Sequence, residues 1–122
     1  MEQVLYILVN SDIKIAKGKL AGQVGHAVDV FYYHFYEQTE RISSPTYTGV
    51  TRANIQAYHQ TGIKKIILKC DEATLLQLES AGYLAIRDRG LTHLAPNTLT
   101  CVCAGLFEKG SAPEWIQQLK LY

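Results

Sequence analysis

The feature that most constrains the fold is an uninterrupted apolar run near the start of the chain. Residues Val4–Val9 read VLYILV, so an extended strand here has no polar side chain on either face. Such a strand is stable where both of its faces are covered, as in a sheet packed between helices. The run is far too short to cross a bilayer. It therefore predicts a central strand of an α/β protein.

The remainder of the chain alternates between helical and extended patterns. A second run that is apolar on both faces covers Leu99–Phe107, and apolar residues recur at helical spacing from Gly18 onward. Further strands are predicted over Ile63–Cys70 and Tyr83–Arg87, and further helices over Arg52–Gln60, from an Asp71 cap through Ala81, and after the capping-box sequence Ser111–Glu114. The polar segment Glu40–Thr51 is expected to be a loop. The order β-α-α-β-α-β-β-α predicts a single domain over residues 1–122, with a small mixed four-stranded sheet and helices on both faces.

Charge on this chain is local rather than global. Twelve Lys and Arg residues against 11 Asp and Glu residues give a net charge of +1, and hence a weak overall field. The basic residues gather in three places, Lys14–Lys19, Lys64–Lys69 and Arg87–Arg89. Any contact with a polyanion must therefore come from these clusters.

The three cysteines predict free thiols rather than a disulfide framework. Cys101 and Cys103 alternate within an apolar run, and Cys70 ends a predicted strand. No second Cys or His pair has the spacing that would complete a zinc site with Cys101 and Cys103. Because no export signal is visible either, we expect a cytoplasmic protein in a reducing compartment, with no metal, no cofactor and no membrane contact.

The densest basic cluster coincides with a predicted helix start. Lys14, Lys17 and Lys19 surround Gly18 with no acid among them. The N–H groups and the dipole at a helix start attract anions, lysines strengthen phosphate binding there, and glycine allows a ligand to approach the backbone. A solvated basic loop is the alternative reading of this pattern, which is not a P-loop. Lys14, Lys17 and Gly18 are therefore candidate phosphate-binding residues.

Three polar residues share one stripe of this predicted helix. Lys19, Gln23 and His26 stand at i, i+4 and i+7, beside the apolar stripe that continues through Phe35. A lone helical histidine is most often a structural residue, so His26 stays open between that role and a site. The aromatic residues at 31–36 fit a core and an interface better than a platform for nucleobases.

A second candidate site follows the third predicted strand. Asp88-Arg89-Gly90-Leu91-Thr92 places a carboxylate at a strand end with a hydroxyl four residues later, which suits the orientation of a water molecule or a ribose. The alternative is an ordinary turn in which Arg89 pairs with Asp88. If the first and third strands are parallel neighbours, their following loops meet at one edge of the sheet. Lys19 and His26 then lie near Asp88 and Thr92.

These motifs together resemble the peptidyl-tRNA hydrolase type 2 family. The similar stretches are SDIKIAKGKLAGQVGHA, KKIILKCDEATLLQL, AIRDRGLTHLAPNTLTCVCAG and the closing LKLY, which follow in the family's order. The chain differs from the usual D-A-G-R-T in having Arg89 and Leu91, and it has Gly25 before the histidine where serine is common.

The resemblance implies a metal-independent esterase that cleaves the bond between a peptide, or an N-blocked amino acid, and the 3′ end of tRNA. It implies catalytic roles for Lys19, Asp88 and Thr92, and a place in the same cleft for Gln23 and His26. Its natural partner is the acceptor end of peptidyl-tRNA, which Arg89 and the lysines at the helix start would help to bind. A homodimer is also implied by the resemblance alone.

Two other functions remain open from the residues themselves. One is an RNA- or protein-binding module that keeps the fold without turnover, which the unusual Leu91 leaves possible. The other is an esterase for small N-acyl esters, which the near-neutral net charge mildly favours.

Overall fold

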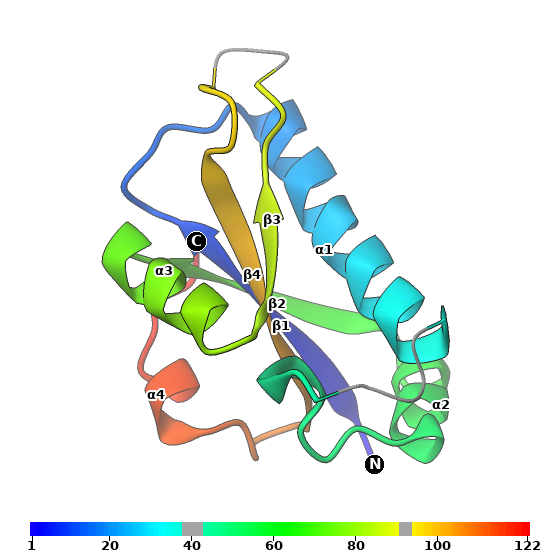
Figure 1. Ribbon diagram of the computed structural model, residues 1–122. Coiled ribbons are helices and arrows are strands. Elements are labelled where there is room, and N and C mark those ends of the chain that lie inside the picture. The colour runs from blue at the N-terminus through cyan, green and yellow to red at the C-terminus, as the bar shows by residue number, and fades with distance from the viewer. Residues whose placement is uncertain (38–42, 91–93) are drawn as a thin grey trace.

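A four-stranded mixed sheet forms the centre of the molecule. The computed structural model describes residues 1–37, 43–90 and 94–122. The strands are β1 (Gln3–Asn10), β2 (Lys64–Cys70), β3 (Leu84–Arg87) and β4 (Leu99–Glu108), in the spatial order β2-β1-β4-β3. β1 pairs in parallel with β2, whereas β4 pairs antiparallel with both β1 and β3. Figure 1 shows this sheet with helices on either side of it.

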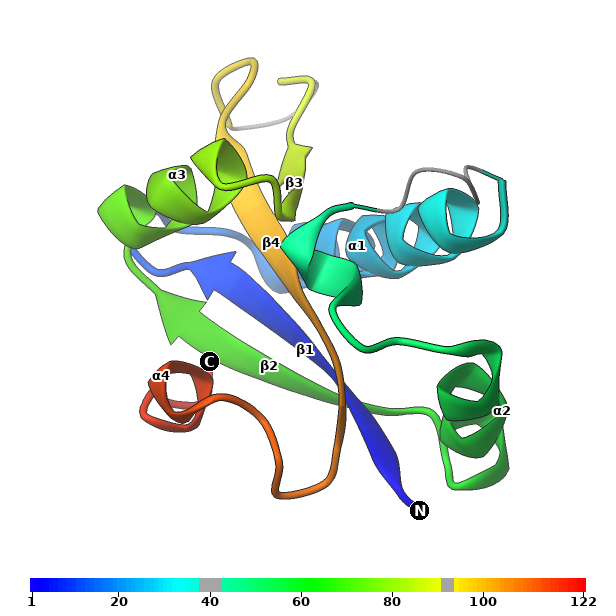
Figure 2. The same cartoon turned by 60° about the horizontal axis from the view of Figure 1, so that its bottom comes forward.

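Helices cover both faces of the sheet, as the sequence predicts. They are α1 (Lys17–Glu37), α2 (Arg52–Gln60), α3 (Glu72–Ser80) and α4 (Glu114–Gln117). One core lies between the sheet and α1 and α2, and the other lies between the sheet and α3 and α4. The turned view in Figure 2 separates these two layers. Every residue of β1 is buried, which confirms its central position.

The predicted helix limits follow from local capping chemistry. Residues Arg52–Gln60 form α2 as predicted, with Thr51 in a capping box at its start. Asp71 caps α3 by accepting a hydrogen bond from the Thr74 N–H at 2.8 Å. Gly82, which has φ of +101°, follows the end of this helix in the left-handed conformation that glycine adopts readily. The apolar stripe of α1 packs into the core through Ala27 and Phe31.

The condition that the first and third strands are neighbours is not met, because β4 lies between them. β4 is apolar on both faces and buried over most of its length, so it needs an interior position in the sheet. β1 and β3 both run antiparallel to β4, and their C-terminal ends therefore still lie at one edge of the sheet. In Figure 1 the end of β3 and the start of α1 lie together at the top of the molecule.

Two smaller expectations are also corrected. The capping box at Ser111–Glu114 does not form, since Pro113 precedes the first turn of α4 and offers no side-chain hydrogen bond. The described part of the expected Glu40–Thr51 loop contains a 3₁₀ turn, η2 (Pro45–Tyr47). Thr46 in this turn is fully buried, where its hydroxyl donates to the Cys103 carbonyl at 2.7 Å and accepts from the Leu84 N–H at 3.1 Å.

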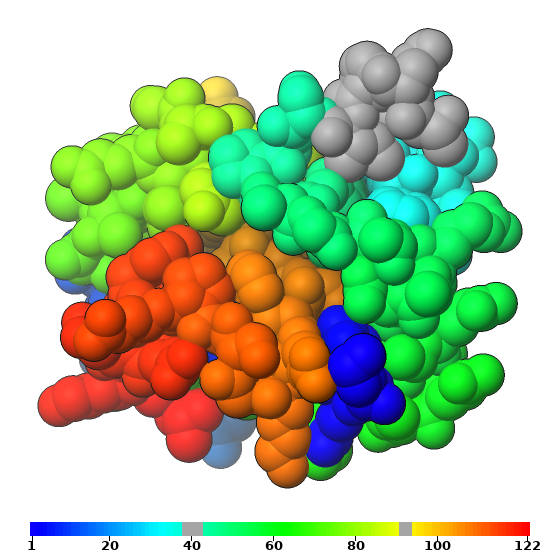
Figure 3. Space-filling view, turned by 90° about the horizontal axis from the view of Figure 1, so that it is seen from below, coloured from blue at the N-terminus to red at the C-terminus, as the bar shows by residue number. Residues whose placement is uncertain are grey.

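At the lower end of the molecule in Figure 1, surface segments pack against one another. Figure 3 shows the N-terminal residues, the β4–α4 connection, α4 and α2 side by side on this face. Trp115 of α4 meets Tyr83 edge to face, with ring centroids 6.2 Å apart, which fastens α4 beside the start of β3. Within the residues described, no helix is both long and apolar enough to span a membrane.

The cysteines are buried free thiols, which confirms the reading of the sequence. Burial raises the pKa of Cys101 and of Cys103 to about 12, and that of Cys70 to about 11. All three therefore stay protonated at neutral pH and act as small apolar residues of the core.

Candidate active site

The centre of the site is an ion pair between α1 and the end of β3. Lys19 Nζ lies 2.5 Å from Asp88 Oδ1, and the side chains are 18% and 3% exposed. Lys19 reaches this point from the first turn of α1, whereas Asp88 directly follows β3. The structure confirms the prediction that these two residues meet, and it pairs the Asp88 carboxylate with the Lys19 ammonium.

Backbone and side-chain groups fix the Asp88 carboxylate in place. The Gly90 N–H donates to Asp88 Oδ2 at 2.7 Å, and the Gln23 side-chain amide lies 3.4 Å from Oδ1. The main chain of Asp88 makes two further hydrogen bonds across the loop: its N–H donates to the Thr98 carbonyl, and its carbonyl accepts from the Asn97 N–H. The contacts from Gly90 and Gln23 bring N–H donors to the carboxylate oxygens, which favours the carboxylate anion.

Thr100 supports the site from beneath and was not predicted from the sequence. Its fully buried hydroxyl donates to Gln23 Oε1 at 2.6 Å and lies 3.2 Å from the Ile86 carbonyl. This bond turns the amide N–H₂ of Gln23 toward Asp88. The available signal was a hydroxyl within an otherwise apolar strand, since a buried polar side chain needs a partner.

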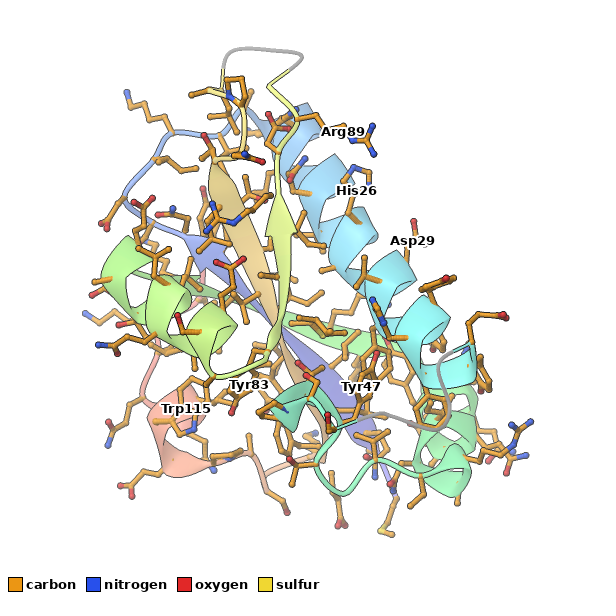
Figure 4. All side chains as sticks on the ribbon, in the orientation of Figure 1. His26, Asp29, Tyr47, Tyr83, Arg89 and Trp115 are labelled. Atoms are coloured by element: carbon orange, nitrogen blue, oxygen red, sulfur yellow. The ribbon has the colours of Figure 1, made fainter. Side chains whose placement is uncertain are left out.

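A polar pocket of about 190 Å³ opens over the ion pair. It is lined by Lys19, Gln23, His26, Arg87, Asp88 and Arg89. The predicted stripe of α1 thus lies beside the predicted β3 loop, and Figure 4 shows His26 and Arg89 on the same side of α1. Both residues are exposed, so they can reach toward a ligand at the pocket mouth.

Arg87 lines the pocket but is held by other groups. Its guanidinium makes a two-pronged contact with Glu79, at 3.0 and 2.6 Å, and donates to the Asn97 carbonyl at 2.7 Å. The hydrogen bonds with Glu79 raise the pKa of Arg87 and lower that of Glu79. Arg87 therefore braces the loop against α3, whereas Arg89 is the pocket arginine available to a ligand.

The other predicted site residues lie apart from this pocket or outside the described structure. Lys17 and Lys14 line two further surface hollows on the other flank of the α1 start. Gly18 stands between Lys17 and Lys19, and no heavy atom lies within 4 Å of the position that a Cβ would take there. Thr92 lies outside the described residues. Over the described ranges, no three His, Cys, Asp or Glu side chains are grouped to hold a metal ion.

The arrangement provides what uncatalysed ester hydrolysis lacks. A carboxylate can orient a water molecule, and an ammonium beside it can stabilise negative charge on a carbonyl oxygen. The fold and site together define an α/β protein with a lysine–carboxylate pair in a small polar pocket. The family model described as "Peptidyl-tRNA hydrolase PTH2" matches residues 3–122.

Peptidyl-tRNA hydrolases of several organisms are similar to this chain over most of its length. A peptidyl-tRNA hydrolase of Methanopyrus kandleri is 33% identical, over 81% of this chain and 80% of that protein. One of Staphylothermus marinus is 34% identical, over 94% and 91% of the two chains, and one of Pyrobaculum aerophilum is 32% identical, over 100% and 99%. The chain belongs to the peptidyl-tRNA hydrolase PTH2 family.

Gly90 provides a test of the loop that carries the site. Its φ is +78°, and a Cβ here would lie 2.7 Å from Pro96 backbone atoms. We expect Gly90→Ala to lower the free energy of unfolding by about 1–3 kcal/mol, through strain and displacement of the loop. The matched control is Gly25→Ala in α1, where a Cβ meets no atom within 4 Å and helix propensity improves by about 0.5–1 kcal/mol. Thermal unfolding of both variants measures this, and an unchanged Gly90→Ala midpoint contradicts the described loop.

Proposed function

We propose that this protein hydrolyses the ester bond between a peptide, or an N-blocked amino acid, and the 3′-terminal ribose of tRNA. The observation that carries the proposal is the Lys19–Asp88 pair at the base of a small polar pocket. Membership of the PTH2 family supports the same substrate class. The reaction would return tRNA to translation, and its place would then be the cytoplasm.

In the proposed mechanism Asp88 orients the attacking water. The water oxygen adds to the ester carbonyl carbon, and Lys19 stabilises the negative charge that develops on the carbonyl oxygen. The carbon–oxygen bond to the ribose then breaks, and the ribose oxygen leaves with the proton that the water lost. Lys19 suits this role because an ammonium has three N–H donors, and contact with Asp88 needs only one of them.

Other predicted residues take supporting roles in the proposal. Gln23 holds the carboxylate, whereas His26 and Arg89 contact the terminal nucleotide from the pocket mouth. Lys14, Lys17 and the exposed N–H groups around Gly18 bind phosphates of the acceptor end, since anions favour helix starts. Thr92 positions the substrate.

The decisive experiment compares two substrates, N-acetyl-aminoacyl-tRNA and an N-acetyl-aminoacyl-adenosine ester, and two variants of the site. We expect the purified protein to hydrolyse N-acetyl-aminoacyl-tRNA, with Lys19→Ala lowering kcat by about 10²–10³-fold because it removes a transition-state stabiliser. Asp88→Asn keeps the shape but loses the charge, so kcat should fall while tRNA binding persists. Release of free tRNA in steady-state kinetics measures both effects, and Lys64→Gln, whose lysine pairs with Glu2 away from the site, is the control.

Each alternative function gives a different result in this experiment. A binding module would bind the tRNA and release no product. An esterase for small molecules would act on an N-acetyl-aminoacyl-adenosine ester and spare the tRNA. Normal turnover by Lys19→Ala would exclude the proposed mechanism.

Thr100 is expected to act through Gln23 as a positioning residue. Thr100→Val keeps the volume but leaves the buried Gln23 Oε1 without its donor, so the amide no longer holds Asp88. We expect kcat to fall by about 10–100-fold with little change in KM, because small misplacements of reacting groups have effects of this size. Thr100→Ser restores the hydroxyl and should restore kcat. Equal kcat for the Val and Ser variants would show that the hydroxyl has no positioning role.

Activity is expected to survive removal of divalent ions. The proposed water activation uses Asp88 and Lys19 alone, so dialysis against EDTA should leave kcat on the adenosine ester unchanged. The small ester is the right substrate because magnesium also folds tRNA. Loss of activity on chelation, followed by recovery with a divalent ion, would contradict the mechanism.

A further inference from the structure

A second hollow lies on the flank of α1 opposite to the candidate active site. It is a groove of about 600 Å³ between α1 and β2, whose lining includes Lys17, Leu20, Val24, Lys65, Ile67 and Tyr122. Residues 17, 20, 21 and 24 turn away from the stripe that carries Lys19, Gln23 and His26. The groove and the polar pocket thus lie on two sides of the first turns of one helix.

The described lining of this groove combines apolar side chains with two cationic ones. Leu20, Val24 and Ile67 supply apolar surface, and among the described residues the charged side chains of the lining are Lys17 and Lys65. Lys65 is exposed, and its ammonium donates to the Ile63 carbonyl at 2.9 Å and lies 5.3 Å from the centre of the Tyr58 ring. Its other N–H donors remain available to an anion.

An aromatic ring, that of Tyr122, lines the same groove as these cations. The Tyr122 N–H donates to the Ile67 carbonyl at 3.0 Å, and Leu121 forms a β-bridge with Leu68, so this end segment lies along the edge of β2. Tyr122 is 41% exposed. It lines the groove and also an adjoining hollow of about 470 Å³, whose lining includes Lys14.

We propose that this groove binds the single-stranded nucleotides that precede the ester-bearing 3′ nucleotide, with one base stacked on Tyr122 and phosphates at Lys17 and Lys65. The inference rests on the proposed function, because it takes the reacting ester to lie at Lys19. From there the strand crosses the open backbone at Gly18, over a helix about 10–12 Å wide. Aromatic rings beside a cationic track are how proteins hold single strands without reading sequence.

Charge complementarity favours a nucleotide strand over the other possible occupants. Two copies of this chain facing each other here would bring the same lysines together. A peptide offers no fixed negative charge to meet Lys17 and Lys65, whereas every nucleotide brings a phosphate. An apolar floor and an aromatic ring also suit a nucleobase, which has an apolar face and polar edges.

The test uses variants of Tyr122 and Lys65. It measures their kcat/KM on two substrates and the salt dependence of their affinity for tRNA. We expect Tyr122→Ala to lower kcat/KM on N-acetyl-aminoacyl-tRNA by about 5–100-fold, the range for loss of one stacked base, and Tyr122→Phe to keep it. Lys65→Gln should reduce the slope of log affinity against log salt by about 0.7 for one phosphate contact to a single strand. On N-acetyl-aminoacyl-adenosine, which has no preceding nucleotide, all three variants should match the unmodified protein.

Matched controls separate the groove from general surface effects. Tyr33→Ala removes another exposed tyrosine of this chain, and Lys64→Gln removes the neighbouring lysine that pairs with Glu2. Both should leave the tRNA kinetics unchanged. If the unmodified protein cleaves neither substrate, the proposed function fails, whereas intact turnover with no effect of Tyr122→Ala or Lys65→Gln overturns only the groove.

Two further outcomes would assign the groove to another occupant. A drop in sedimenting mass on Tyr122→Ala would make it a contact between subunits. Equal losses for Tyr122→Ala on the tRNA and adenosine substrates, growing with peptide length, would make it a peptide site. Either result overturns the proposal.

Discussion

The ion pair between Lys19 and Asp88 is the interaction on which the site depends. Asp88 is buried, and a buried carboxylate is tolerated only where charges and hydrogen bonds compensate for lost water. Removing one partner from a buried pair typically costs about 3–5 kcal/mol, because the other charge stays behind uncompensated. Lys19 is only partly covered, so water reduces this cost. The pair therefore joins α1 to the end of β3 and leaves its cation reachable from the pocket.

The sheet order explains why these two residues meet. β4 separates β1 from β3, yet both end at one edge because both run antiparallel to β4. Asn10, fully buried at the end of β1, donates to the Leu99 carbonyl at 2.9 Å and so ties that edge to the start of β4. One residue further along β4, Thr100 reaches Gln23 and through it Asp88. The central strands thus fix the orientation of groups that approach the substrate from α1 and β3.

The first turn of α1 divides two surfaces of different chemistry. The flank with Lys19 faces a small polar pocket, whereas the flank with Lys17 faces a larger apolar groove with cationic residues. The first turn holds two lysines, Lys17 and Lys19, and no acid, so these charges repel each other and oppose the helix dipole. An anion lying across the turn would relieve both effects. The proposed function and the proposed nucleotide groove give this lysine cluster one physical purpose.

Local sequence determined the elements, and tertiary structure decided the site. The runs at Val4–Val9 and Leu99–Phe107 predicted buried strands because no polar side chain interrupts them, and Thr51 and Asp71 set helix starts through short-range capping bonds. The Ser111 box failed because only the final packing of α4 decides whether such a cap forms. No local pattern could place β4 between β1 and β3, join Thr100 to Gln23, or bring Tyr122 and Lys17 into the lining of one groove. Those contacts link residues far apart in the chain, so the folded sheet alone determines them.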